Sequence, residues 1–181
     1  MAVDSLRALA RLLDVPERTL RRAAADGLVH GRRVSERRYV TTLREEEYLR
    51  THWQLLSLLR ASLRTEPNVR AAVLFGSTAV GRESDGSDVD LLVWLRDSSA
   101  RAVAGLAGRL RERVGRDVQL VRFEDAQRSA ALIVDALADG RVLIDRDDVW
   151  PAVRESERDW KRRAAAQDVA LEDAMPDLGE V

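Results

Sequence analysis

Residues 69–95 read VRAAVLFGSTAVGRESDGSDVDLLVWL, and this stretch decides how the rest of the chain is interpreted. It contains two apolar runs, 71–75 and 91–95, each of the length expected for a buried strand. Gly76 and Ser77 interrupt the apolar pattern directly after the first run. The pattern therefore predicts two strands of one sheet, with a sharp corner at the end of the first.

Two carboxylates, Asp88 and Asp90, lead into the second run, so the spacing is G-S-x10-D-x-D. Alternate side chains of a strand point to the same face, which places these two carboxylates together. Like charges so close repel each other unless a cation lies between them. Mg²⁺ takes oxygen ligands and is held by one or two carboxylates plus substrate phosphates. The pair therefore indicates a magnesium site, with Val89, Leu91 and Val93 packed on the opposite face.

Gly76 and Ser77 suggest a phosphate site beside the carboxylates. Glycine lets backbone approach a ligand closely. A helix that begins at Ser77 would direct its N-terminal N–H groups toward a phosphate. Glycine and aspartate between strands are also ordinary turn residues, which is the competing structural interpretation.

The stretch resembles the nucleotidyltransferase superfamily that includes DNA polymerase beta, and within it the minimal nucleotidyltransferase branch. The resemblance covers about residues 68–150. It implies an α/β (α+β) fold in which a small mixed sheet is flanked by helices. The residues that carry it are Gly76, Ser77, Gly81, Arg82, Ser87, Asp88, Asp90 and Leu91.

The resemblance also implies a catalytic site. A third carboxylate is expected on a neighbouring strand, and Asp117, which opens the apolar run 117–121, is the candidate. Asp88, Asp90 and Asp117 would then be the catalytic and metal-binding residues and would hold two Mg²⁺ ions. The donor would be a nucleoside triphosphate, with ATP expected. The nucleotide-binding residues implied are Gly76, Ser77, Arg82 and Ser87.

Composition excludes several other classes of protein. The chain has no cysteine, so it has neither a disulfide framework nor a thiolate metal site. No run approaches the ~18 apolar residues of a membrane span, and a cytoplasmic location is expected. Residues 1–64 contain 13 arginines and 8 acidic residues, whereas the remainder contains 17 basic and 23 acidic residues. This asymmetry predicts two domains with different partners.

Residues 1–42 are predicted to form a DNA-binding domain. Two short helices joined at Asp14, with Pro16 opening the second, suggest a helix-turn-helix. Strands are expected at 28–30 and 38–40. The segment resembles the winged helix-turn-helix domains of bacterial regulators, although Asp14 replaces the usual glycine. The expected DNA contacts are Arg18, Thr19, Arg21, Arg22, Arg32, Arg33, Arg37 and Arg38. A small helical domain with a solvated arginine face remains the alternative.

Residues 43–67 are predicted to form a helix that connects the two domains. Its apolar positions from Leu43 to Leu63 recur at helical spacing, and any exposed part of this stripe would suit a homodimer seam. The nucleotidyltransferase domain is expected at 68–168, with helices at 98–113, 125–138 and 147–163 and strands at 117–123 and 141–144. Residues 169–181 are expected to form a flexible acidic tail.

Two functions remain open at this point. The first is a Mg²⁺-dependent nucleotidyltransferase that moves a nucleoside monophosphate to a hydroxyl of a partner protein or RNA. In the minimal branch, some members look like antitoxins that adenylylate a partner toxin and others resemble toxins that modify tRNA. This analogy implies a toxin–antitoxin component that regulates its own operon through operator DNA. The alternative is a non-catalytic transcriptional regulator whose second domain senses a nucleotide or binds a partner.

Overall fold

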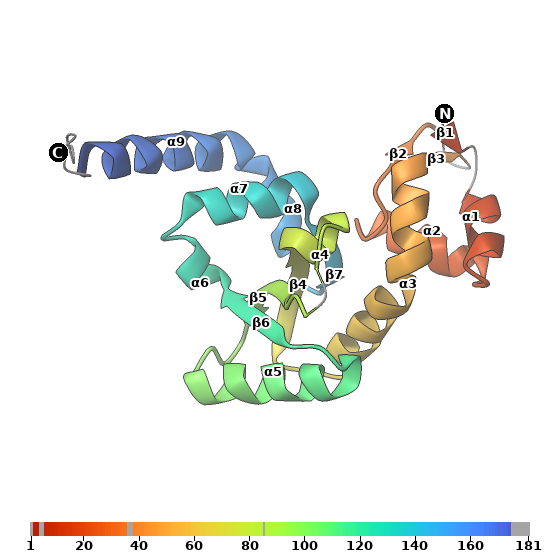
Figure 1. Cartoon of the computed structure of the whole chain (residues 1–181), viewed down its shortest axis with the longest axis horizontal. Coiled ribbons are helices and arrows are strands. Elements are labelled where there is room, and N and C mark those ends of the chain that lie inside the picture. Colours follow the sequence, from red (N-terminus) through yellow and green to blue (C-terminus); the bar gives the residue numbers. More distant parts are fainter. Residues whose placement is uncertain (1, 4–5, 36–37, 85, 175–181) are drawn as a thin grey trace.

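A four-stranded mixed sheet forms the centre of the molecule, with the N-terminal segment packed at one side (Figure 1). A computed structural model describes residues 2–3, 6–35, 38–84 and 86–174. The strand order is β6-β5-β4-β7, with β4 antiparallel to both β5 and β7, and β5 parallel to β6. The strands are β4 (Val69–Phe75), β5 (Val89–Leu95), β6 (Val118–Arg122) and β7 (Arg141–Asp145). The prediction of a small mixed sheet flanked by helices is confirmed.

The two faces of the sheet bury different sets of side chains, as strand alternation requires. On one face, Val89, Leu91 and Val93 belong to the core that also contains helices α3 (Leu43–Arg64) and α5 (Ala100–Val114). On the other face, Leu92 and Trp94 pack in a second core. The helices of this second layer are α6 (Phe123–Ala126), α7 (Ala130–Asp139), α8 (Val149–Glu155) and α9 (Glu157–Ala174). Asp90 shares the face of Leu92, so it lies on the side of the second layer.

The N-terminal segment contains two helices and a small sheet. Asp14 lies in the turn between the helices with φ of 52°, the left-handed conformation that aspartate tolerates. The elements are β1 (Ala2–Val3), α1 (Leu6–Leu12), α2 (Glu17–Ala25), β2 (Arg32–Arg33) and β3 (Tyr39–Thr42). The strand expected at 28–30 is wrong, since Leu28 and Val29 are buried in the core outside any strand. The sheet order is β1-β3-β2, so β1 supplies a strand that the sequence did not suggest.

Helix α3 joins the N-terminal segment to the sheet. Thr42 caps it, because its hydroxyl oxygen accepts a hydrogen bond from the Glu45 N–H at 3.1 Å. Leu49, Leu56, Leu59 and Leu63 are fully buried in the chain's own core. Most of the stripe proposed as a homodimer seam is therefore already covered, and Leu43 is its one leucine that is more than a third exposed.

The C-terminal helices differ from their predicted bounds. The single helix expected at 125–138 is divided into α6 and α7, and the one expected at 147–163 into α8 and α9. Helix α9 continues to Ala174, so the predicted tail begins inside a helix; residues 175–181 lie outside the described part. No helix among the described residues combines the length and apolar character that crossing a membrane requires.

Candidate functional site

The corner at Gly76 lies directly beside Asp90. Strands β4 and β5 pair so that Phe75 faces Asp90, and Gly76 then begins the short helix α4 (Gly76–Val80). Gly76 has φ of 72°, a conformation that favours glycine. A Cβ at this position would lie 2.8 Å from the Asp90 Oδ2 atom. A side chain at position 76 would therefore press on the carboxylate, and glycine keeps the space beside it open.

Asp88 and Asp90 form a pair of carboxylates at the start of β5. Asp88 is exposed and Asp90 is half-buried. Burial, and then the neighbouring Asp88 carboxylate, raise the pKa of Asp90 above its usual range. A divalent cation between the two carboxylates would relieve both effects, so this pair fits a magnesium ion chemically.

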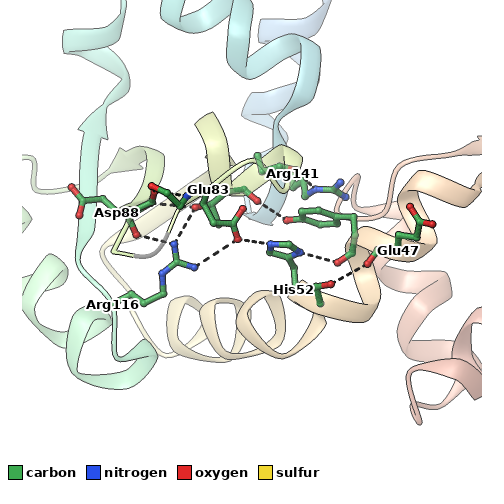
Figure 2. A network of polar contacts seen from close by, with 12 residues as sticks. Glu47, His52, Glu83, Asp88, Arg116 and Arg141 are labelled. Atoms are coloured by element: carbon green, nitrogen blue, oxygen red, sulfur yellow. Dashed lines mark hydrogen bonds and ion pairs between the residues drawn. The ribbon is translucent and has the colours of Figure 1, made fainter.

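A polar network holds the loop between α4 and β5 against helix α3 (Figure 2). The buried His52 ring contacts the Glu83 carboxylate through Nε2 and the Tyr48 carbonyl through Nδ1. The Tyr48 hydroxyl donates to the carbonyl of Thr78 at 3.1 Å. The Thr78 hydroxyl in turn donates to the carbonyl of Asp88 at 3.2 Å. The position of Asp88 thus depends on contacts that reach back to the N-terminal half of the chain.

Arg116 holds the same loop from the other side. Its guanidinium donates to the Ser87 carbonyl at 2.8 Å and lies 4.0 Å from the Glu83 carboxylate. Neither Arg116 nor His52 belonged to the predicted site. The sequence offered no signal for Arg116, whereas His52 was visible as one of two histidines in the chain.

The other two predicted nucleotide contacts lie in this loop. Arg82 has an exposed side chain, and its backbone N–H donates to the Ser77 carbonyl at 3.0 Å. The Ser87 hydroxyl instead accepts a hydrogen bond from the Ser84 N–H at 3.0 Å, closing a turn. The Arg82 side chain is therefore exposed to solvent, whereas the Ser87 hydroxyl shapes the loop.

Asp117 does not join the other two carboxylates. Its side chain is 59% exposed and forms an ion pair with Arg111 at 3.0 Å. Its backbone carbonyl accepts from the Val89 N–H at 2.8 Å, just before β6 begins. The described residues contain no group of three His, Cys, Asp or Glu side chains that could hold a metal. The geometry therefore departs from the predicted three-carboxylate site.

Four of the seven arginines predicted to bind DNA, together with Thr19, line a groove of about 770 Å³. Helix α2 forms one wall and helix α3 the other, and Arg33 of β2 also contributes. Arg32 and Arg38 are exposed nearby in sequence, and Arg37 lies outside the described residues. The lining residues are Arg18, Thr19, Arg21, Arg22, Ala25, Arg33, Trp53, Ser57, Arg60, Ala61 and Arg64. The contribution of α3 to the groove was not predicted, because residues 43–67 were expected only to connect the two domains.

The sheet order and the Gly76–Asp90 arrangement define this domain as a nucleotidyltransferase fold. The family model described as "Polymerase beta, Nucleotidyltransferase" matches residues 58–149, half of the chain. The chain therefore belongs to the polymerase beta nucleotidyltransferase family. No curated protein matches its sequence.

Solved structures share the fold at low sequence identity. A structure described as a toxin-antitoxin with AMP-PNP is 24% identical, with a TM-score of 0.52, and covers 67% of this chain and 95% of its own. A variant of the toxin-antitoxin MntA-HpeT is 23% identical, with the same TM-score and the same coverages. A protein from Shewanella oneidensis is 20% identical, with a TM-score of 0.50, and covers 66% of this chain and 95% of its own. These similarities establish the shared fold.

Proposed function

We propose that the chain is a magnesium-dependent nucleotidyltransferase that moves a nucleoside monophosphate from ATP to a hydroxyl of a partner protein or RNA. The single observation that carries this proposal is the juxtaposition of the open Gly76 corner with the Asp88–Asp90 pair. Asp88 and Asp90 would hold the magnesium ion, and the ion would neutralise charge on the phosphates of a triphosphate bound at the corner.

The chain's own residues contribute position and charge. Gly76 and Ser77 leave backbone available at the corner, and the exposed Arg82 can neutralise a phosphate oxygen. In the reaction, the acceptor oxygen forms a bond to the α-phosphorus while the bond to the pyrophosphate oxygen breaks. The acceptor proton passes to solvent and pyrophosphate leaves. Most of the rate enhancement would come from alignment of the two reactants.

The choice of donor and partner is supported by the structures that share the fold. One of them was described with AMP-PNP, an ATP analogue, and two as toxin–antitoxin assemblies. A role of this chain as one component of such a pair follows by analogy. Its acceptor would then be the partner protein, with RNA as the second candidate.

Removal of magnesium is expected to abolish label transfer. The chain should be incubated with ATP labelled on the α-phosphate and with either the protein encoded by the adjacent gene or a tRNA pool. We expect transfer in Mg²⁺ and none in EDTA, because the two carboxylates and the phosphates repel each other without a cation. Restoration by excess Mg²⁺ is the control. Nucleotide binding with no transfer to any acceptor would favour the alternative, a regulator that senses nucleotide without turnover.

The arginine-lined groove favours a second activity, binding of DNA. Arginines contact phosphates, and a helix of a helix-turn-helix enters the major groove. Arg22 of α2 and Arg64 of α3 have exposed side chains and form no ion pair with another residue in the described part of the chain. They lie on opposite walls of the groove, so one nucleic acid bound there would contact both.

Replacing both Arg22 and Arg64 by alanine is expected to weaken binding to duplex DNA from upstream of the gene by about 10-fold or more. A plot of the logarithm of affinity against the logarithm of salt concentration has a slope set by the number of phosphate contacts. The loss of two contacts would reduce the size of that slope by about two. Fluorescence anisotropy at several salt concentrations measures both. The matched control replaces Arg101 and Arg128, exposed arginines outside the groove. If the control variant loses as much affinity for DNA, the binding reflects nonspecific attraction between the chain's positive charges and the DNA.

A further inference from the structure

The neighbouring strand contributes an amide, not a carboxylate, to the face that carries Asp90. In the parallel pairing of β5 with β6, Asp90 is in register with Gln119. Val118 and Leu120 pack in the core of Val89 and Leu91, on the opposite face. Gln119 is exposed, so its amide stands beside Asp90 on the accessible face of the sheet.

Asp117 faces different surroundings. It lines a hollow of about 710 Å³ together with His52, Glu83 and Arg116, and neither Asp88 nor Asp90 lines that hollow. Its carboxylate is already paired with Arg111, at the C-terminal end of α5. Its charge is therefore already balanced by an arginine of the chain.

The supply of carboxylate ligands then limits the number of cations. Mg²⁺ in proteins is commonly held by one or two carboxylates plus substrate phosphates, so the Asp88–Asp90 pair and the triphosphate together supply the ligands of one ion. A second ion about 3.5–4 Å away would need a further carboxylate of its own. The Gln119 amide is neutral, supplying one acceptor oxygen and two N–H donors. It can orient a ligand, but it offers no charge for a second ion and cannot remove a proton from an acceptor.

We propose that Gln119 is a positioning residue of the nucleotide site, and that the site consequently holds a single divalent cation, the one that accompanies the triphosphate. This inference rests on the proposed nucleotide binding at Gly76 and Asp90. It replaces the two-ion site implied by the sequence resemblance. The acceptor hydroxyl consequently loses its proton to solvent or to a group of the acceptor itself.

Replacing Gln119 by aspartate tests the proposal as a gain of function. Mn²⁺, a spectroscopic substitute for Mg²⁺, is titrated into the full chain with a non-hydrolysable ATP analogue and counted by electron paramagnetic resonance. We expect one nucleotide-dependent Mn²⁺ in the wild type and two in Gln119→Asp. Transfer should rise by about 10-fold or more in Gln119→Asp, because a positioned base contributes about 10²-fold or more. The neutral variant Gln119→Asn is the control and should keep one ion.

Asp117→Asn separates the possible outcomes. We expect it to leave both the ion count and the transfer rate unchanged. If the wild type binds two Mn²⁺ ions, and in particular if Asp117→Asn then binds only one, the single-cation site is wrong. The proposed nucleotidyl transfer would not be affected by that result. One ion in the wild type without transfer to any acceptor would refute the proposed catalysis and support the single-cation site. If the wild type binds no Mn²⁺ together with the ATP analogue, both the proposed catalysis and the single-cation site are refuted.

Discussion

Asp90→Asn is expected to reduce nucleotidyl transfer by about 10²–10³-fold, the range found when one electrostatic stabiliser of a reaction is removed. Asparagine keeps the size of the side chain but removes the charge that would hold the metal opposite the phosphates. Because Asp90 lies beside Gly76, its loss affects the place where the triphosphate and the cation would meet. Initial rates with α-labelled ATP at saturating Mg²⁺ measure the effect.

The stability of the same variant distinguishes a catalytic role from a structural one. The pKa of Asp90 is raised in the folded protein, by burial and then by Asp88. A carboxyl with a raised folded-state pKa favours folding in its protonated form, so its ionisation at neutral pH opposes folding. Neutral asparagine removes that penalty. In EDTA at pH 7, we therefore expect the melting temperature of Asp90→Asn to equal or exceed that of the wild type.

Asp135→Asn provides the matched control, since Asp135 is an exposed carboxylate on α7 that does not belong to the Asp88–Asp90 pair. It should retain full transfer and full stability. Wild-type transfer in Asp90→Asn would contradict the assigned site. A large fall in its melting temperature in EDTA would show that the carboxylate serves the fold instead.

The sequence predicted the strands and the Gly76 corner, where local chemistry was decisive. Apolar runs of strand length became β4 and β5, and the corner glycine took the positive φ that its position required. Asp88 and Asp90 were placed together by the alternation of one strand, which needs no knowledge of the rest of the fold. Each of these inferences depends on neighbours in the chain.

The errors arose where partners lie far apart in sequence. The position of Asp117 relative to Asp88 and Asp90 depends on the register of β6 against β5, which is fixed by how Val118 and Leu120 pack. A run such as 117–121 reads as a strand in either register. Likewise, α3 was recognised as a helix, but its burial against the sheet depended on partners outside its own sequence.

The Glu45–Arg141 ion pair is the clearest example of a long-range contact that the sequence did not reveal. Arg141 lies in β7 and Glu45 in the first turn of α3, and their side chains are 4% and 5% exposed. Two hydrogen bonds of 2.7 and 2.8 Å join guanidinium and carboxylate. Arg141 also donates to the Ala79 carbonyl of α4 at 2.8 Å and stacks over the Tyr48 ring. One buried cation therefore connects the sheet, the connecting helix and the helix that begins at Gly76.

Glu45→Gln is expected to lower the free energy of unfolding by about 3–5 kcal/mol, the cost of leaving one member of a buried ion pair without its partner. Glutamine fills the same volume, so packing changes little while the Arg141 charge loses its counter-ion. The Glu45 carboxylate also accepts a hydrogen bond from the backbone N–H of His30 at 2.9 Å, and the side-chain oxygen of glutamine can retain this bond. Urea denaturation followed by circular dichroism measures the change.

Asp147→Asn serves as the control because it breaks an ion pair of the same chemistry at the surface. Asp147 pairs with Arg70 at 2.6 Å, with side chains 36% and 44% exposed, and such pairs contribute at most about 1 kcal/mol. If Glu45→Gln costs no more than Asp147→Asn, water must reach Arg141 in solution. A cost of the expected size would mean that the buried pair holds the N-terminal segment against the sheet. Because Arg141 also binds the Ala79 carbonyl, the same substitution should then weaken nucleotide binding at Gly76 although it lies outside the site.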